Sequence, residues 1–458
     1  MNSKQRRITA AAAAALACAA APAFGQSADA LIDKLVEKGI LTVKEANELR
    51  EEADKNFSQA YSVKSGMPDW VSSLKFNGDF RGRFEGFYGA NDNFVDRNRF
   101  RYRLRFGVTA NLFENMEVGL RLTSSEAGSG GSFGGDPISG NTTFQDNASK
   151  KFVYFDLAYA KWSFLNTPKV GASGILGKME NPFVFTDMVF DGDYTPEGFA
   201  LQAHFNFNDK HVARAAAGLY ILDEIGASSN DPFWVGAQVR LDSTWSKKVQ
   251  TTAGVAVLAL ENEEKLGANV SGTSVTWTVP NQNAGNLRTP VTGPGAGGVL
   301  VNDYNPIVGD VALTYNLDQF YRYNAPFPIR VAGDIIYNPA ADSRNLGYQA
   351  GVTFGKAGKR GLWEIGYRYK HLEGDAWYEE IVDADFGAYY QSGAAWSASA
   401  SGYLPGTNVK GHIIRASYSP FDSLTFTATA FLTELIEESP EDSESGMTRL
   451  QLDAVWKF

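Results

Sequence analysis

Apolar and polar residues alternate with a period of two along most of the chain after Trp70. The pattern is sharpest in Arg97–Val108, where arginine stands at every second position from 97 to 105 and large apolar residues fill most positions between. Successive side chains of a β-strand point to opposite faces. This segment is therefore predicted to be a strand with one charged and one apolar face.

The same alternation recurs up to the C-terminus and predicts sixteen strands, each about long enough to cross a bilayer when tilted. They are expected at residues 72–88, 97–112, 115–125, 151–164, 170–180, 197–207, 211–222, 232–245, 248–260, 307–317, 327–338, 346–355, 361–373, 409–419, 422–434 and 447–458. The predicted fold is all-β, a transmembrane antiparallel β-barrel of about sixteen strands.

The connections between these strands alternate in length. Turns such as 112–115, 165–169, 208–210, 246–247, 356–360 and 420–422 are short, whereas the connections 126–150, 261–306, 374–408 and 435–446 are long. Outer-membrane barrels have short periplasmic turns and long external loops. An even number of strands then places both ends of the barrel on the periplasmic side.

A soluble all-β protein, a sandwich or a propeller, is the alternative that the same alternation allows. No repeat at a propeller period is visible. The strand length, the asymmetry of the loops and an aromatic content of 13% favour the membrane barrel.

The first 66 residues differ from the rest. Lys4, Arg6 and Arg7 precede an apolar run from residue 8 to 21 and then small residues, a pattern typical of a cleaved secretory signal peptide over residues 1–25. Residues 26–66 are predicted to form a short periplasmic helical hairpin, either a plain linker or an oligomerisation or docking element. Residues 67–458 are assigned to the outer-membrane barrel.

Composition excludes several classes of function. The net charge is −10, which argues against nucleic-acid binding, because that requires a basic patch. A single cysteine excludes a disulfide scaffold and a cysteine-rich zinc site. The four histidines have no metal-ligand spacing. We therefore expect no catalytic residues, no cofactor and no metal, and so no enzyme.

Two parts of the chain carry a resemblance. The last strand alternates and ends on Trp456 and Phe458, as in bacterial outer-membrane proteins, where this ending is the assembly signal. The segments Gly177–Phe183, Asp187–Asp191 and Thr195–Phe199 resemble the putative porin family of Gram-negative bacteria.

The resemblance implies where the protein is located, which partners it contacts and which loop folds into the lumen. The location is the bacterial outer membrane. The partners are membrane lipid, lipopolysaccharide, the barrel-assembly machinery and small hydrophilic solutes, and a homotrimer is compatible with it. General porins of sixteen strands fold the connection between strands five and six into the lumen. That connection is 181–196 in this chain.

Charge predicts which residues line the lumen. An arginine facing lipid at the bilayer midplane costs roughly 2–4 kcal/mol, so the arginine-bearing faces must point to the water-filled interior. The expected positive wall consists of Arg81, Arg83, Arg97, Arg99, Arg101, Arg103, Arg105 and Arg121. Acids of the 181–196 segment, with one residue just after it, are expected to face this wall: Asp187, Asp191, Asp193 and Glu197.

The function that follows is an outer-membrane porin for passive diffusion of small hydrophilic solutes and ions. The positive wall is expected to make the lumen favour anions, and loop 181–196 is expected to narrow the lumen. A plainer interpretation of the positive wall is solvated charge without a role in selectivity. A plainer interpretation of loop 181–196 is an exposed acidic loop. The alternative function is a non-channel outer-membrane barrel, either structural or adhesive, or a barrel hydrolase.

Overall fold

The computed structural model describes residues 68–92, 94–127, 133–226, 229–271, 274–281, 284–291, 295–387, 390, 404–438 and 444–458. The signal peptide and the helical hairpin expected before residue 67 lie outside the described residues. Within them, no helix is long and apolar enough to span a membrane.

Within the described residues, sixteen long antiparallel strands form one closed sheet, as the alternation predicts. Each pairs with its neighbours in the sequence, and β1 pairs with β20 to close the barrel. The strands are β1 (Val71–Gly89), β2 (Arg97–Leu112), β3 (Met116–Ser124), β5 (Val153–Asn166), β6 (Val170–Lys178), β7 (Glu197–Asn208), β8 (His211–Ile221), β9 (Phe233–Thr244), β10 (Val249–Glu261), β14 (Ile307–Leu317), β15 (Phe327–Tyr337), β16 (Leu346–Gly355), β17 (Leu362–Leu372), β18 (Val409–Phe421), β19 (Leu424–Leu435) and β20 (Met447–Lys457).

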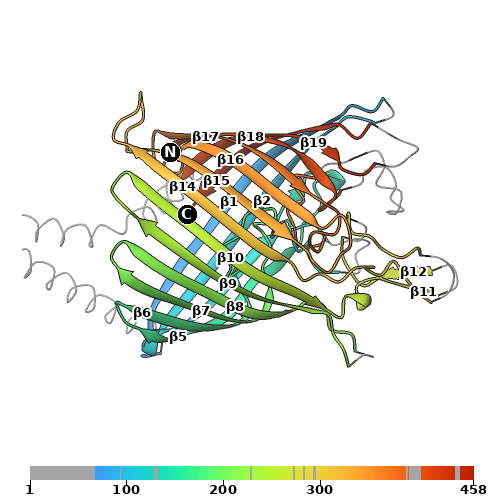
Figure 1. Cartoon of the computed structure of the whole chain (residues 1–458), viewed down its shortest axis with the longest axis horizontal. Coiled ribbons are helices and arrows are strands. Elements are labelled where there is room, and N and C mark those ends of the chain that lie inside the picture. Colours follow the sequence, from blue (N-terminus) through green and yellow to red (C-terminus); the bar gives the residue numbers. More distant parts are fainter. Residues whose placement is uncertain are drawn as a thin grey trace, which may run out of the picture. The chain divides into compact units, whose positions relative to one another are not determined.

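The two ends of the barrel differ, as expected from the lengths of the connections. Figure 1 shows short turns gathered at one end of the tilted strands and long connections at the other. The long connections carry four short strands: β4 (Thr142–Thr143), which pairs with β2, and β11 (Ala268–Ser271), β12 (Ser274–Trp277) and β13 (Gly295–Gly297), which form a small sheet of their own.

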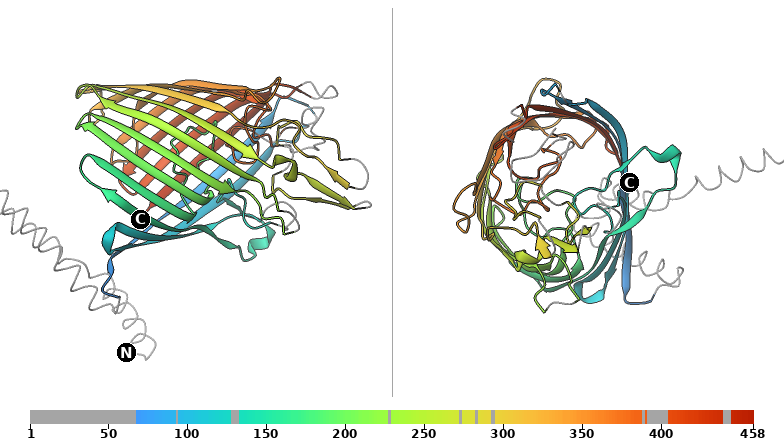
Figure 2. Two further views of the ribbon diagram at one scale, coloured as in Figure 1. Left: turned by 60° about the horizontal axis from the view of Figure 1, so that its bottom comes forward. Right: turned by 90° about the vertical axis from the view of Figure 1, so that its right-hand side faces the viewer.

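The two faces of each strand meet different surroundings. On β2, the side chains of Phe100 and Leu104 are 58% and 46% exposed, whereas Arg101 and Arg103 are 6% and 7% exposed. A barrel with its apolar side chains outside and its arginines inside accounts for this contrast. Viewed along the barrel, connecting segments lie within the ring of strands (Figure 2).

The seam between the first and last strands is held on the outer face and by the backbone. The ring of Phe80 on β1 lies 5.9 Å from that of Trp456 and 6.4 Å from that of Tyr102, measured between centroids. The terminal residue extends the ladder: Phe458 N donates to Gly78 O at 3.1 Å, and Gly78 N donates to Phe458 O at 2.9 Å.

Deleting Phe458 is expected to prevent assembly. The deletion removes this pair of backbone bonds at the seam together with the terminal residue of the segment that the sequence resemblance predicts to be an assembly signal. We expect the variant to collect in the periplasm or to be degraded, as measured by fractionation and immunoblotting. Phe458→Tyr keeps an aromatic terminal residue and serves as the control. Normal outer-membrane levels of the deletion variant would contradict this role of the C-terminus.

Candidate functional site

The connection between β6 and β7, residues 181–196, lies inside the barrel. Gln238 on β9 both accepts from Val184 N and donates to Val184 O, each at 2.9 Å. Thr186 Oγ1 donates to Asp334 on β15 at 2.6 Å. β9 is separated from β7 only by β8, whereas β15 lies farther around the ring, beyond β10 and β14, so the loop reaches across part of the interior. We call residues 181–196 the inner loop.

Apolar side chains explain why the inner loop folds inward. Met188, Val189 and Phe190 are at most 5% exposed. The ring centroid of Phe190 lies 5.0 Å from that of Trp234 on β9, whose indole N–H donates to a tyrosine of the same loop. A loop standing in water would leave these groups exposed, at about 25 cal/mol per Å² of apolar surface.

Gly177 lets the chain leave β6 toward this loop. Its φ is +114°, and a Cβ there would lie 2.3 Å from Ala158 O on β5. Only glycine adopts such a backbone conformation without strain.

A second connection, residues 373–387 between β17 and β18, packs against the inner loop. Asp191 N donates to Ile381 O at 2.8 Å, and Ile381 belongs to the same apolar cluster as Phe190. Arg449 on β20 donates to the carbonyl oxygen of Asp385 at 2.7 Å. The sequence predicts this segment only as part of a long external connection and gives no signal that it enters the barrel.

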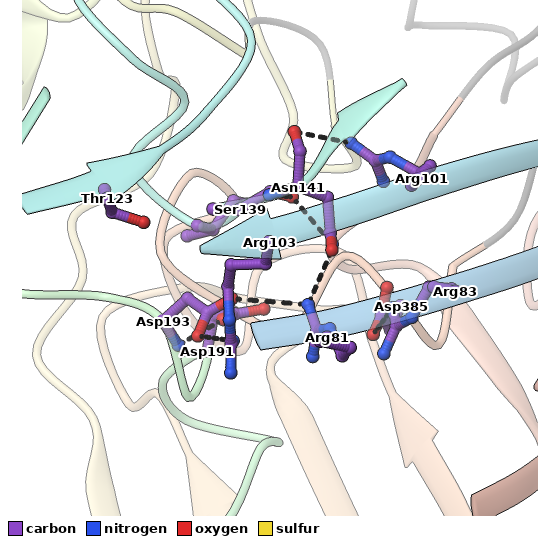
Figure 3. A network of polar contacts seen from close by, with 12 residues as sticks. Arg81, Arg83, Arg101, Arg103, Thr123, Ser139, Asn141, Asp191, Asp193 and Asp385 are labelled. Carbon is purple, nitrogen blue, oxygen red and sulfur yellow. Dashed lines mark hydrogen bonds and ion pairs between the residues drawn. The ribbon is translucent and has the colours of Figure 1, made fainter. Parts of the chain in front are cut away.

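The arginines of β1 and β2 meet acids both on the wall and on the inner loop. Figure 3 shows Arg81 and Arg103 beside Asp193 of the inner loop. Arg103 donates to Asp79 at 2.8 Å and to Asp193 at 2.7 Å. Arg105 pairs with the same two carboxylates, at 2.6 and 3.4 Å. Arg81 lies 3.9 Å from Asp193. The inner loop is therefore tied to the arginine-bearing wall through one aspartate.

A second group of charges surrounds Glu85, which is fully buried on β1. Its carboxylate lies 2.5 Å from Arg99, 2.7 Å from Arg449 and 3.7 Å from Arg101. In the same way, Arg83 pairs with two carboxylates at 2.7 and 2.9 Å, one from β20 and one from residues 373–387: Asp453 and Asp385.

The other predicted site residues lie elsewhere. Asp187 pairs with Arg368 on β17 and lies 3.8 Å from Lys370, across the lumen from β2. Asp191 accepts a bond from the backbone N of Asp193, at 2.6 Å. Arg97 lies at the loop end of β2, and Arg121 is paired with Asp156 and Glu180. Glu197 is paired with Lys178 at 3.0 Å and lines a cavity of about 700 Å³ together with Arg103, Arg105 and Asp193.

Sequence reasoning missed five groups of this network. Asp79 and Glu85 share the parity of Arg81 and Arg83 on the first strand, so alternation alone could have found them. The same holds for Arg449 and Asp453, which share the inward parity of the last strand. Asp385 comes from a loop and leaves no periodic signal.

The pKa values of two inner-loop acids are shifted in opposite directions. Burial alone would raise the pKa of Asp193, but the neighbouring guanidinium groups of Arg103 and Arg81 hold it below its usual range. Burial raises the pKa of Asp191 well above its usual range, and the nearby carboxylate of Asp383 adds to the effect. Asp193 contacts the arginines, whereas Asp191 accepts a backbone hydrogen bond.

An open polar space remains beside the inner loop. A cavity of about 580 Å³ is bounded on one side by Arg81 and Arg83 and on the other by Arg330, Arg368 and Arg415. Aspartates of both inward-folded segments also reach it. Ions and small polar molecules can find partners of either sign there. Within the described residues, no group of three His, Cys, Asp or Glu side chains is arranged to hold a metal ion.

The contact between the long connections is expected to depend on pH. Burial, together with Glu379, raises the pKa of Glu380 to about 8. Its Oε2 accepts from the backbone N of Asn281 at 2.9 Å. Because the folded-state pKa is raised, the stabilising contribution of the neutral form is full at low pH and is lost as the pH rises through about 8. Each pH unit between about 5 and about 8 should cost up to about 1.4 kcal/mol, and the loss levels off above about pH 8.

Limited proteolysis of the folded protein between about pH 5 and about pH 9 measures this effect. We expect cleavage in residues 261–306 and 373–387 to increase in the wild type as the pH rises to about 8 and to level off above it. Glu380→Gln removes the titrating group and should flatten the profile. Identical profiles for the two proteins would show that Glu380 does not control the contact.

Comparison with known proteins gives one family and several barrels. The model of a family described as putative porin matches residues 87–286. A structure of Pseudomonas putida OprB at high pH aligns with 87% of this chain and 97% of its own, at 11% identity and a TM-score of 0.51. Two more distant barrels cover 84% of this chain. They are a loop-deletion mutant of Vibrio cholerae OmpT (99% of its chain, 12% identity, TM-score 0.46) and Salmonella typhi OmpF in complex with daunomycin (97%, 11%, 0.46). No curated protein matches the chain.

Proposed function

We propose, because residues 87–286 match the putative porin family and the chain closes into a sixteen-strand barrel, that this outer-membrane channel is a porin for passive diffusion of small hydrophilic solutes and ions. The observation that carries the proposal is the polar cavity of about 580 Å³ beside the inner loop. It is bounded by charged side chains of β1, such as Arg81, and of β15, β17 and β18, such as Arg368. A lumen of this kind offers solutes water and ionic partners along the path.

The inner loop narrows this channel. It is anchored to β9, to β15 and to the arginines of β2, so it spans the interior instead of lying on one wall. Residues 373–387 fill further space beside it. The passage that remains runs between the inner loop and the strands, where the charged groups of the cavity stand.

The channel is weakly selective for anions. Within the ion-pair group around β1, β2 and β20, seven arginines are paired with six carboxylates, so this group has one positive charge in excess. The arginines are Arg81, Arg83, Arg99, Arg101, Arg103, Arg105 and Arg449, and the carboxylates are Asp79, Glu85, Glu126, Asp193, Asp385 and Asp453. Low-dielectric walls focus the field of such a charge on the lumen. The preference is modest because pairing cancels most of the ladder.

In the membrane, the outer aromatic face contacts lipid, and the long connections stand at the lipopolysaccharide side. Assembly uses the C-terminal strand ending in Trp456 and Phe458. A homotrimer is compatible with this arrangement.

One observation favours a second candidate, a closed structural barrel. Two segments fold into the lumen and most inward arginines are paired, as in a barrel that does not conduct. Planar-bilayer recording of the purified protein separates the two. We expect discrete conductance steps in potassium chloride, a small anion-directed reversal potential in a salt gradient, and uptake of small sugars by proteoliposomes. Protein that is folded and inserted but gives no steps and no uptake would contradict the porin.

A further inference from the structure

A separate cavity of about 430 Å³ lies between the inner loop and the wall built by β5 to β9. Its basic lining residues come from four strands: Lys161 on β5, His204 on β7, Arg214 on β8 and Arg240 on β9. Among the described residues that line it, none carries a carboxylate. It therefore differs from the mixed charges of the wall formed by β1 and β2.

Among the described residues, two of these basic side chains are unpaired. Within the described residues, Lys161 and His204 make no hydrogen bond or ion pair with another side chain, whereas Arg214 pairs with Asp242 at 2.8 Å. Glu117 stands opposite Lys161 in the register of β3 and β5 but accepts a bond from Tyr159 at 2.6 Å. Lys161 and His204 can thus offer their donors to a solute.

Contacts with neighbouring residues hold the rest of the cavity lining in place. Arg240 is 7% exposed and is fixed by Asp310 at 2.6 Å and by Val184 O at 3.1 Å, so the inner loop forms one side of the cavity. Gly171 lies directly opposite His204 in the register, and a Cβ there would lie 2.2 Å from the imidazole Cε1. Glycine at this position gives the imidazole ring the room it occupies against β6.

We propose that this cavity binds small solutes through an oxyanion group, either phosphate or a group of similar charge and shape. Lys161 supplies an unpaired ammonium, and Ser173, Gln202 and His204 supply further hydrogen-bond donors around it. The cavity is larger than a lone phosphate and leaves room for an organic part. It lies toward the short-turn end, near the turns at 166–170 and 208–211, which is the periplasmic end of such barrels.

The inference rests on the proposed function, because the site would hold anions after they pass the inner loop. Within the ~8 Å screening length at physiological salt, the excess positive charge of this cavity acts on a solute as one field. A site of moderate affinity behind the narrow part of the path would favour anionic solutes over neutral ones of equal size.

Binding of inorganic phosphate to the purified, folded chain tests the site without relying on conduction. The protein is kept in a sugar-based detergent, which contributes no phosphate, and the line width of the phosphorus NMR signal is followed as phosphate is added. We expect saturable broadening in the wild type. In Lys161→Gln/His204→Gln, the dissociation constant should rise about tenfold, equivalent to about 1.4 kcal/mol.

A matched control replaces the same residue types at the same end of the barrel. Lys210→Gln/His211→Gln alters one lysine and one histidine beside the β7–β8 turn, outside the cavity lining, and should leave phosphate binding unchanged. Wild-type binding that both variants retain would assign phosphate to the arginines of β1 and β2 and would overturn the inference.

Bilayer recording of the same proteins separates the two proposals. Conductance without saturable phosphate binding would overturn the anion site and leave the porin intact. Phosphate binding that depends on Lys161 and His204 in a barrel without conductance would support the site and overturn the porin.

Discussion

A variant lacking Thr186–Tyr194 is expected to carry at least roughly twofold more current per channel than the wild type, because conductance follows the open cross-section of the narrowest part. The deletion removes the part of the inner loop that reaches β15, β17 and the arginines of β2. Larger sugars should enter proteoliposomes in the same variant. Selectivity should weaken as well, since Asp193 no longer faces the wall.

The control for this deletion is the removal of residues 146–150, an exposed part of the connection between β4 and β5. It removes five residues, against nine in the inner-loop deletion, from a loop outside the lumen and should leave conductance unchanged. Heat-modifiable migration on a gel confirms that both variants form barrels. A correctly assembled inner-loop deletion with wild-type conductance and sugar cutoff would exclude the inner loop as the narrowest part.

Replacing Arg101, Arg103 and Arg105 with alanine is expected to reverse the charge preference of the channel. Four arginines of the wall then stand against six carboxylates, and Asp79 loses both of its arginine partners. The excess of one positive charge becomes an excess of two negative charges. We expect the anion-to-cation permeability ratio to fall on the order of tenfold and the reversal potential to change sign in a salt gradient.

Adding Asp79→Asn and Asp193→Asn to the triple variant gives the matched control. Four arginines then face four carboxylates, so near-neutral selectivity should return. This control also addresses folding, because leaving buried carboxylates without their partners can cost roughly 3–5 kcal/mol, and the asparagines remove that charge. An unchanged reversal potential in the folded triple variant would show that these arginines do not act on the conducting path.

The strands could be predicted from the sequence because their signal is local. Alternation assigns each residue of β2 to one face, and the cost of an arginine in lipid decides which face is inward. The lengths of the connections then distinguish the two ends of the barrel. The same parity, applied to β1, would also have found Asp79 and Glu85 as partners of the arginines.

The partners of the inner loop could not be predicted in this way. Asp187 was expected to face the arginines of β2, yet it pairs with Arg368 on β17. A loop has no side-chain period, so its sequence does not indicate which wall each of its acids reaches.

The sequence by itself thus determined the barrel and the inward direction of the arginines, because a period of two and the cost of charge in lipid act within each strand. Its resemblance to porins indicated that loop 181–196 folds into the lumen. The tertiary structure alone decided the pairing: Asp193 with Arg103, Arg83 with Asp385, and the entry of residues 373–387. These contacts join segments 90 and 302 residues apart along the chain. Such partners come together only when the barrel closes and its loops compete for the same apolar and charged interior.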